Sequence, residues 1–453
     1  MTFYSPADLL STTQGADYIL ITAPEFLSGA QQLANLRSSQ GLRVAVVNIN
    51  DIYNQFNEGI YHPIAIKNFL RYAYYLWQKP SPVFVVLIGD GNSNFLNVPI
   101  YGQAPIYMPP NLAWIDYTQG EIDNSNALVT VVGDDLLPDM IVARIPVNSL
   151  TQMQAVVDKT IAYEQSLPDQ VWQNTILMTA DNVPDAAGDF VGISNQLIQD
   201  YVLPNYTSQT VYLNNYPDAA TARSALVQKI NDGALIISYV GHGYLDKWAS
   251  EGLFLTSTIP SLSNSNRMPI VLSMTCMDGY WGPPPSYASS VAEEMVRAEN
   301  KGAVVQFSST GYGTVSDHDV LERGFLQASL TDGVREVGYS ALAGKLNLFQ
   351  AGIGKDVIQS FTIFGDPALR LKLPSSLPTP TPTITRTATY TVTNTMTNTT
   401  TPTQTITPTQ TITPTVTATI TGTIPTPTST IEPTSTPIPT IPPKIYLPVV
   451  ISP

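Results

Sequence analysis

Short apolar runs alternate with amphipathic stretches along most of the chain. In the first half, "YILIT" (18–22), "LRVAVVNI" (42–49) and "PVFVVLIGD" (82–90) predict buried strands, and the helix-spaced apolar residues of 64–77 predict a helix between them. The alternation resumes with "NTILMTA" (174–180), "GALIISYV" (233–240), "MPIVLSMT" (268–275) and "GAVVQFSST" (302–310). Short buried strands that alternate with helices indicate a parallel sheet with helices on both faces. The pattern therefore predicts an α/β fold.

The length of this α/β region predicts two subdomains. Residues 15–372 carry the alternating pattern, and this span exceeds the ~250 to 300 residues at which single hydrophobic cores stop growing. We expect an N-terminal α/β subdomain over 15–168 and a second one over 169–372, each with a mainly parallel sheet.

The rest of the chain has a different composition. Residues 373–443 are rich in Thr and Pro, as in "TPTPTITRTATYTVTNTMTNTTTPTQ". Such repeats cannot bury enough apolar surface to fold, so a disordered, extended stalk is expected. The final segment 444–453, "KIYLPVVISP", is too short to span a bilayer. It predicts either an attachment or sorting element or simply an apolar terminus.

Charge and hydropathy exclude two classes of partner. The formal net charge is −14 and no basic stripe is present, so nucleic-acid binding is not expected. No apolar run reaches the ~20 residues of a transmembrane helix. The start, "MTFYSPADLL", shows no export signal, yet the stalk is typical of extracellular or cell-surface proteins. We therefore expect a truncated start and possible cell-surface attachment through the tail.

Two predicted strands end in residues that carry chemistry. The strand 233–240 leads into Gly241, His242 and Gly243, and the strand 268–275 leads into Cys276, the single cysteine of the chain. Ligands bind at the carboxyl ends of strands in open parallel sheets. If the two strands are neighbours, their ends lie about 5 Å apart. His242 and Cys276 would then face the same crevice.

This pair predicts a cysteine hydrolase. A thiol attacks a carbonyl as its thiolate, and an adjacent imidazole can take the proton. The backbone amides of Gly243 and Cys276 are candidate donors to the developing oxyanion. The alternative is a small buried cysteine and a loop histidine in a glycine turn.

The surrounding motifs resemble the gingipain family of cysteine endopeptidases, within the larger group that includes caspases and legumains. The resemblance is carried by "YVGHGYLDKWASEGLF", "LSNSNRMPIVLSMTCMDGYW", "LIGDGN", "PDMIVARIPV" and "FTIFGDPALRLK". It implies a caspase-like fold with Cys276 as nucleophile, His242 as general acid and base, and Gly243 and Cys276 as oxyanion donors. No cofactor is implied for the chemistry, and the substrates would be proteins or peptides.

The resemblance also suggests further site residues. Asp139 in "PDMIVAR" matches the acid that orients the histidine, or is an exposed loop acid. The acid that gives some gingipains their arginine specificity falls near Gln152, so a strict preference for arginine before the cleaved bond is not expected. Trp248 and Trp281 flank the two motifs and either wall the substrate cleft or pack in the core.

A structural calcium ion is the one metal that the resemblance suggests. Asp134 and Asp135 are adjacent candidate ligands, although calcium needs six to eight oxygens. No His and Cys constellation predicts zinc.

The resulting hypothesis is an exported or surface-tethered cysteine endopeptidase that forms a thioester intermediate. Two alternatives stay open: a catalytically idle surface-binding or adhesion protein of the same fold, and a sortase-like processing peptidase of a secretion system.

Overall fold

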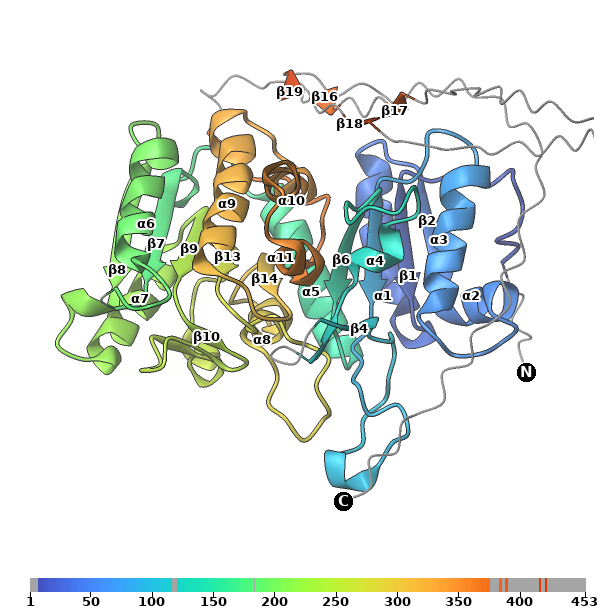
Figure 1. Ribbon diagram of the computed structural model, residues 1–453, viewed down its shortest axis with the longest axis horizontal. Coiled ribbons are helices and arrows are strands. Elements are labelled where there is room, and N and C mark those ends of the chain that lie inside the picture. Colours follow the sequence, from blue (N-terminus) through green and yellow to red (C-terminus); the bar gives the residue numbers. More distant parts are fainter. Residues whose placement is uncertain are drawn as a thin grey trace, which may run out of the picture.

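A ten-stranded sheet runs through the whole molecule (Figure 1). The computed structural model describes residues 7–115, 120–182 and 184–374, and beyond them only four two-residue strands, β16 (Thr383–Ile384), β17 (Ala388–Thr389), β18 (Thr415–Val416) and β19 (Ile420–Thr421). The predicted stalk over 373–443 therefore lies almost entirely outside the described residues, and the segment 444–453 lies wholly outside them.

The order of the strands places the two halves of the chain side by side. From one edge to the other the order is β2 (Val44–Asn48), β1 (Tyr18–Thr22), β3 (Phe84–Ile88), β6 (Ile141–Ile145), β15 (Phe361–Phe364), β14 (Val305–Ser309), β13 (Ile270–Met274), β9 (Ile236–Val240), β7 (Thr175–Ala180) and β8 (Thr207–Tyr212). In Figure 1 the blue and teal strands of the first half lie on the right, and the green to orange strands lie on the left.

One junction reverses the direction of the sheet. All neighbouring strands are parallel except β14 and β15, which pair antiparallel with Gln306 opposite Phe364. The carboxyl ends of β3 and β6 therefore lie at one edge, and those of β13, β9 and β7 lie at the other. Because β15 comes from the end of the described chain yet pairs with β6, the two predicted subdomains share one sheet.

The strands are buried on both faces, as their continuous apolar runs predict. On β1, Tyr18 and Leu20 face one core cluster while Ile19 and Ile21 face another. On β9, Ile236 and Ile237 likewise belong to clusters on opposite faces. This alternation follows the two-residue period of a strand. The α/β class predicted from the pattern is confirmed.

Helices cover both faces of the sheet (Figure 1). They are α1 (Leu27–Ser39), α2 (Ile49–Phe56), α3 (Ile64–Leu76), α4 (Asn126–Val129), α5 (Leu150–Gln165), α6 (Phe190–Leu197), α7 (Ala219–Asp232), α8 (Val291–Arg297), α9 (Val315–Leu326), α10 (Val337–Ala351) and α11 (Lys355–Ser360). The short helical turns are η1 (Pro24–Phe26), η2 (Pro99–Tyr101), η3 (Val171–Asn174), η4 (Ile198–Val202), η5 (Leu213–Asn215), η6 (Thr256–Ser261) and η7 (Gln327–Thr331). Within the described ranges, no helix is long and apolar enough to cross a membrane.

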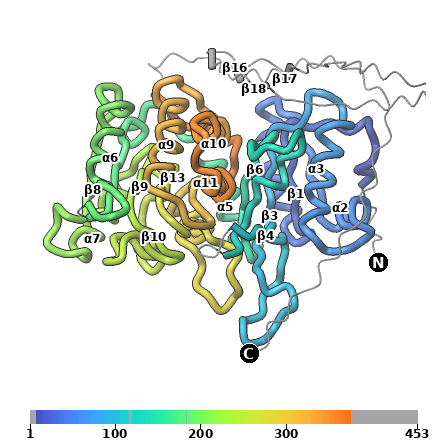
Figure 2. Tube along the Cα trace, in the orientation of Figure 1, coloured from blue at the N-terminus to red at the C-terminus, as the bar shows by residue number. Residues whose placement is uncertain are grey.

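Within residues 7–374, two small sheets lie outside the main one. β4 (Leu112–Trp114) pairs with β5 (Glu121–Asp123), and β10 (Gly243–Tyr244), β11 (Lys247–Trp248) and β12 (Phe254–Leu255) form an antiparallel set directly after β9. Figure 2 also shows two long loops, in cyan after β3 and in yellow after β13, that project on the same side of the molecule. They touch through a hydrogen bond from Ser286 N to Tyr101 O of 3.0 Å.

Buried cations join the two halves of the chain. The Lys159 Nζ on α5 donates to the carbonyl oxygens of Met295, Lys301 and Ala303, and burial lowers the pKa of Lys159 to about 7. The guanidinium of Arg37 on α1 pairs with Asp366 at 2.8 Å. Removing one partner of such a buried pair would leave the other uncompensated, so these contacts fix how the halves pack.

The end of the described chain gives a testable boundary for the folded unit. Leu373 is only 5% exposed, and its carbonyl accepts a hydrogen bond from Arg335. A chain ending at Pro374 is expected to unfold like the full chain, because Thr/Pro repeats bury little apolar surface. A chain ending at Lys372 loses Leu373 and about 2 kcal/mol of unfolding free energy. Denaturant unfolding of the three lengths measures this, and equal midpoints would contradict it.

Candidate active site

His242 and Cys276 lie at the carboxyl ends of two neighbouring strands. β9 and β13 pair in parallel, with Val240 opposite Met274. His242 lies two residues after Val240, and Cys276 lies two residues after Met274, so both follow paired residues at the same distance. The predicted adjacency of these strands is confirmed, and it results from their register rather than from any contact between the two side chains.

The loops after the two strands touch at Gly243. A Cβ atom added to Gly243 would lie 2.6 Å from the carbonyl oxygen of Cys276 and closer still to the Thr275 hydroxyl. Thr275 Oγ1 in turn donates to the carbonyl oxygen of Gly241 at 2.7 Å. Glycine is thus required at 243 because the loop of Thr275 and Cys276 occupies the space that a side chain would take.

In the hairpin of β10 and β11, the register leaves the backbone N–H of Gly243 without a hydrogen bond to β11. Ala249 N donates to His242 O at 2.8 Å, so His242 and Ala249 form a hydrogen-bonded pair. Hydrogen-bonded and non-bonded pairs alternate along antiparallel strands, so Gly243 and Trp248 form a non-bonded pair. The Gly243 N–H therefore points away from β11. This direction suits the predicted oxyanion role, which stays a prediction together with that of the Cys276 amide.

A carboxylate from the next strand holds the imidazole. His242 Nε2 and Asp185 Oδ2 are 2.8 Å apart, and the side chains are 43% and 48% exposed. The hydrogen bond from His242 lowers the pKa of Asp185, which therefore accepts as a carboxylate. The ring of Phe190 packs edge-on against the imidazole at 5.2 Å. The backbone N–H of His242 donates to Asp181 Oδ2 at 3.1 Å, so the loop after β7 fixes both ring and backbone.

Asp139 does not occupy the position predicted for it. It precedes β6, and β15, β14 and β13 lie between β6 and β9, a separation of about 19 Å at the usual strand spacing. Its Oδ2 accepts hydrogen bonds from Val131 N and Val132 N at 2.7 and 2.8 Å. The prediction that Asp139 orients His242 is therefore wrong in this structure, where Asp185 makes that contact.

Cys276 lies in a turn that constrains its backbone and partly shields its thiol. The Sγ atom is 3.7 Å from Gly313 O, and the next residue, Met277, has a φ of 60°. Burial raises the pKa of the Cys276 thiol, and the nearby charge of Asp278 raises it further. The thiol is therefore protonated near neutral pH, and attack on a carbonyl would require a base such as His242.

Neither tryptophan lines an open cleft. Trp248 is fully buried and stacks on Tyr239 with ring centroids 4.6 Å apart. Trp281 is 2% exposed, and the Arg144 guanidinium lies 3.8 Å above its ring. Of the two predicted alternatives, core packing describes both residues, and the substrate-binding prediction for them is not supported.

Gln152 lies at the other edge of the sheet. It begins α5, just beyond the carboxyl end of β6, whose direction is opposite to that of β9 and β13. Its Oε1 accepts from Asn148 N at 2.7 Å. The suggested place of Gln152 beside the cleaved bond is therefore wrong, and the argument against arginine built on it fails.

Asp134 and Asp135 lie in the loop before β6, where Asp135 Oδ1 accepts from Leu137 N at 2.8 Å. Among residues 7–115, 120–182 and 184–374, no three His, Cys, Asp or Glu side chains gather as a metal site would require. Calcium binding at this pair stays an untested prediction.

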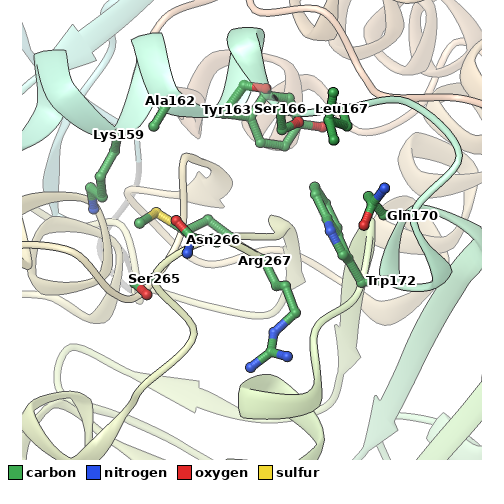
Figure 3. A pocket seen from close by; sticks show the side chains of 11 residues that line it. Lys159, Ala162, Tyr163, Ser166, Leu167, Gln170, Trp172, Ser265, Asn266 and Arg267 are labelled. Atoms are coloured by element: carbon green, nitrogen blue, oxygen red, sulfur yellow. Dashed lines mark hydrogen bonds between the residues drawn. The ribbon is translucent and has the colours of Figure 1, made fainter.

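A separate hollow of about 490 Å³ lies away from His242 and Cys276 (Figure 3). Ala162, Tyr163, Ser166 and Leu167 lie along one side of the view, and Trp172, Asn266 and Arg267 lie along the other. Its wall includes Met268, which precedes the amino end of β13. The hollow therefore opens at the edge opposite to Cys276.

Sequence reasoning missed Asp181 and Asp185. Both follow β7, whose last residue, Ala180, pairs with Val240 of β9. The rule that selected His242 and Cys276, chemistry at the carboxyl ends of adjacent strands, would have selected these acids as well.

The structure is of the α/β class, with a mostly parallel sheet and with His242 and Cys276 beyond the carboxyl ends of two neighbouring strands. The sequence also matches the profile of Peptidase family C25 over residues 11–372. The chain belongs to this family.

Individual relatives are similar at low identity. Gingipain R1 of Porphyromonas gingivalis is 22% identical over 379 residues, which cover 82% of this chain and 35% of that protein. Lys-gingipain of the same organism is 23% identical over 257 residues, covering 54% of this chain and 13% of that protein. The crystal structure of the Arg-specific cysteine proteinase gingipain R superposes with a TM-score of 0.63 at 21% identity, covering 85% of this chain and 83% of that one. The chain spans about a third of the length of gingipain R1.

The contact between His242 and Asp185 generates a prediction that requires no substrate. Asp185→Asn removes the charge that holds the imidazole, so Cys276 should be alkylated by iodoacetamide about two- to fivefold more slowly at pH 7, the modest size reflecting the exposure of the pair. Asp139→Asn is the matched control and should react like the wild type. Equal slowing in both variants, or in Asp139→Asn alone, would contradict the assignment.

Proposed function

We propose that this chain is a cysteine-type endopeptidase that acts through His242 and Cys276. The observation that carries the proposal is the register of β9 and β13, which places the chain's single cysteine and a glycine-flanked histidine at equivalent positions beyond paired residues. Membership of Peptidase family C25 supports the same reaction class.

The contact of His242 with Asp185 determines which ring nitrogen acts in the proposed reaction. With Nε2 bonded to Asp185, the Nδ1 atom of His242 is the nitrogen left to take the Sγ proton of Cys276. The thiolate attacks the peptide carbonyl carbon, a C–S bond forms, and the oxygen becomes an anion that the amides of Gly243 and Cys276 stabilise. As the anion collapses, the C–N bond breaks and the imidazolium protonates the leaving amine.

Hydrolysis of the thioester completes the cycle. His242 takes a proton from water, the hydroxide attacks the thioester carbonyl, and the C–S bond breaks to release the acid and regenerate the thiol. No metal or organic cofactor takes part in this scheme.

The proposed setting is outside the cell, with the Thr/Pro tail as a tether. The tail composition supports this, as do the missing basic stripe and the acidic net charge of −14, which suit an extracellular peptidase better than a nucleic-acid binder. A catalytically idle binding protein and a sortase-like processing peptidase are the competing functions.

Replacing the nucleophile tests the reaction. Cys276→Ala should reduce peptide hydrolysis to background while leaving the melting temperature nearly unchanged, because the change removes one sulfur atom from a half-buried site. His242→Ala should lower turnover about 10²- to 10⁴-fold, the usual contribution of a general base.

The measurement pairs fluorogenic peptide hydrolysis with an irreversible thiol-directed peptidyl probe, whose attachment site is mapped by mass spectrometry. An idle binding protein would fold normally, cleave nothing and take up no peptidyl probe at Cys276. Wild-type turnover in Cys276→Ala would overturn the catalytic assignment.

A basic residue before the cleaved bond is the substrate preference we propose. Asp189 caps α6 by accepting from Gly192 N with Oδ1, and it is exposed next to Phe190, whose ring contacts His242. An exposed carboxylate in this place can pair with a lysine or arginine side chain. Gingipain R is described as Arg-specific and another relative as Lys-gingipain, which supports the choice.

A peptide library with varied residues before the cleaved bond tests the preference. Lysine and arginine peptides should be cleaved best, and Asp189→Asn should raise KM for them about tenfold while leaving an uncharged peptide unaffected. Asp317→Asn, a change at a partly exposed acid in the first turn of α9, is the control. Equal cleavage of basic and uncharged peptides by the wild type would refute the proposed preference.

A further inference from the structure

Asp278 is a fully buried carboxyl group two residues beyond Cys276, in the loop between β13 and α8. Its Oδ2 accepts from Trp248 Nε1 at 3.0 Å, from Gln306 Nε2 at 3.2 Å and from the hydroxyl of Ser273. These donors come from β11, β14 and β13, three different strands. One oxygen atom thus ties the nucleophile loop to the strands around it.

The other carboxyl oxygen is used differently. Within the described part of the chain, Asp278 Oδ1 is buried and has no hydrogen-bond partner. A neutral carboxyl group lowers the cost of burying this oxygen, because the charge is removed while Oδ2 still accepts. An asparagine keeps one acceptor oxygen for the three donors and carries no charge.

The loop that Asp278 holds has a conformation that needs support. Met277, between Cys276 and Asp278, has a φ of 60°, which few residues other than glycine adopt. Its N–H donates to Gly311 O, and the Gly279 N–H donates to Ser309 O, both at 3.0 Å. These backbone bonds tie the loop to β14 and the residues after it, but neither reaches the histidine.

The bond to Trp248 connects the loop to the other half of the dyad. Trp248 is the Cα partner of Gly243, the residue after His242. A displacement of the Cys276 loop would therefore have to break a buried hydrogen bond to the hairpin that begins at His242. Through Ser273 and Trp248, the Asp278 side chain therefore contacts both β13 and this hairpin.

We propose that Asp278 is a positioning residue, which fixes Cys276 relative to His242 and the Gly243 amide by accepting the Trp248, Ser273 and Gln306 hydrogen bonds. The inference rests on the proposed function for its catalytic consequence. Asp278 touches no substrate in this scheme and acts through the loop.

Electrostatics favours the neutral form for this task. Burial raises the pKa of Asp278 to about 7, and its charge in turn raises the pKa of Cys276. The titratable groups that face it are Cys276 and the buried Tyr239 on β9, whose pKa its charge also raises, while its other partners are uncharged donors. Ionisation of Asp278 above neutral pH therefore opposes thiolate formation at Cys276.

Four single variants separate positioning from simple stability. Asp278→Ala removes the shared acceptor, Asp278→Asn keeps it without charge, and Trp248→Phe removes one donor while keeping an aromatic ring. Asp51→Ala is the control, because Asp51 is also a buried acid but lies on α2 in the N-terminal half of the chain, where it accepts from Ala7 N.

The first readout is turnover of folded protein, with folding followed by thermal melting. Asp278→Ala should lower kcat about 10²-fold with KM within about threefold, because a displaced nucleophile misses the reacting carbon. Trp248→Phe should lower kcat in the same direction, and the two changes combined should not exceed Asp278→Ala alone. Asp278→Asn should stay within about threefold of the wild type, and Asp51→Ala should lose stability but not kcat.

The second readout is iodoacetamide alkylation of Cys276 across pH 6 to 10, which has a single possible site and requires no peptidase activity. Asp278→Asn should shift the midpoint of this profile to lower pH than in the wild type, because the opposing charge is gone. A chain that cleaves no peptide but shows this shift would sink the proposed function and leave the contact between Asp278 and Cys276 supported.

Three results would overturn the inference. The first is wild-type kcat in folded Asp278→Ala, or in Trp248→Phe if Asp278→Ala does not fold. The second is a loss in Asp278→Asn as large as in Asp278→Ala, which would mean that the charge and not the acceptor matters. The third is an alkylation profile identical in the wild type and Asp278→Asn.

Discussion

The antiparallel pairing of β14 with β15 determines at which edge of the sheet each strand presents its carboxyl end. Because it reverses the direction of the sheet, the strands on its two sides present their carboxyl ends at opposite edges. His242, Cys276 and the acids after β7 gather at one edge, and the residues after β3 and β6 are sent to the other. A parallel pairing at this one position would have brought α5 and Gln152 to the same edge as Cys276.

At the edge of the sheet that carries His242 and Cys276, exposed side chains lie above buried ones. Asp185 and His242 lie at the surface, where water screens their interaction but a polypeptide can reach them. Asp278 and Trp248 lie beneath, where an unsatisfied polar atom is costly and hydrogen bonds hold geometry firmly. Reactive groups remain accessible while the atoms that determine their spacing are protected from solvent.

The sequence predicted the fold class and two candidate site residues, because buried strands, a single cysteine and a glycine-flanked histidine each allow few interpretations. Buried strands alternating with helices determined the fold class, and the single cysteine and the glycine-flanked histidine determined two residues of the site. Asp139 and Gln152 failed for a shared physical reason: both flank β6, and its direction and distance from β9 depend on a pairing between strands far apart in the chain. The tryptophans failed differently, because an aromatic residue near a strand end is equally compatible with core and cleft until its neighbours are known. Asp185 follows a predicted strand and could have been selected by the same rule as His242, whereas the contacts of Asp278 are visible only in the fold.

The point at which the described chain ends also has an architectural meaning. Lys372 Nζ bonds to the carbonyl oxygens of Glu164 and Ser166, and Ser166 shares the hollow in Figure 3 with Met268 at the amino end of β13. The polypeptide therefore departs from the pole opposite to His242 and Cys276. If the proposed anchor lies downstream, attachment and the access of bulky targets to His242 and Cys276 would not compete for the same space.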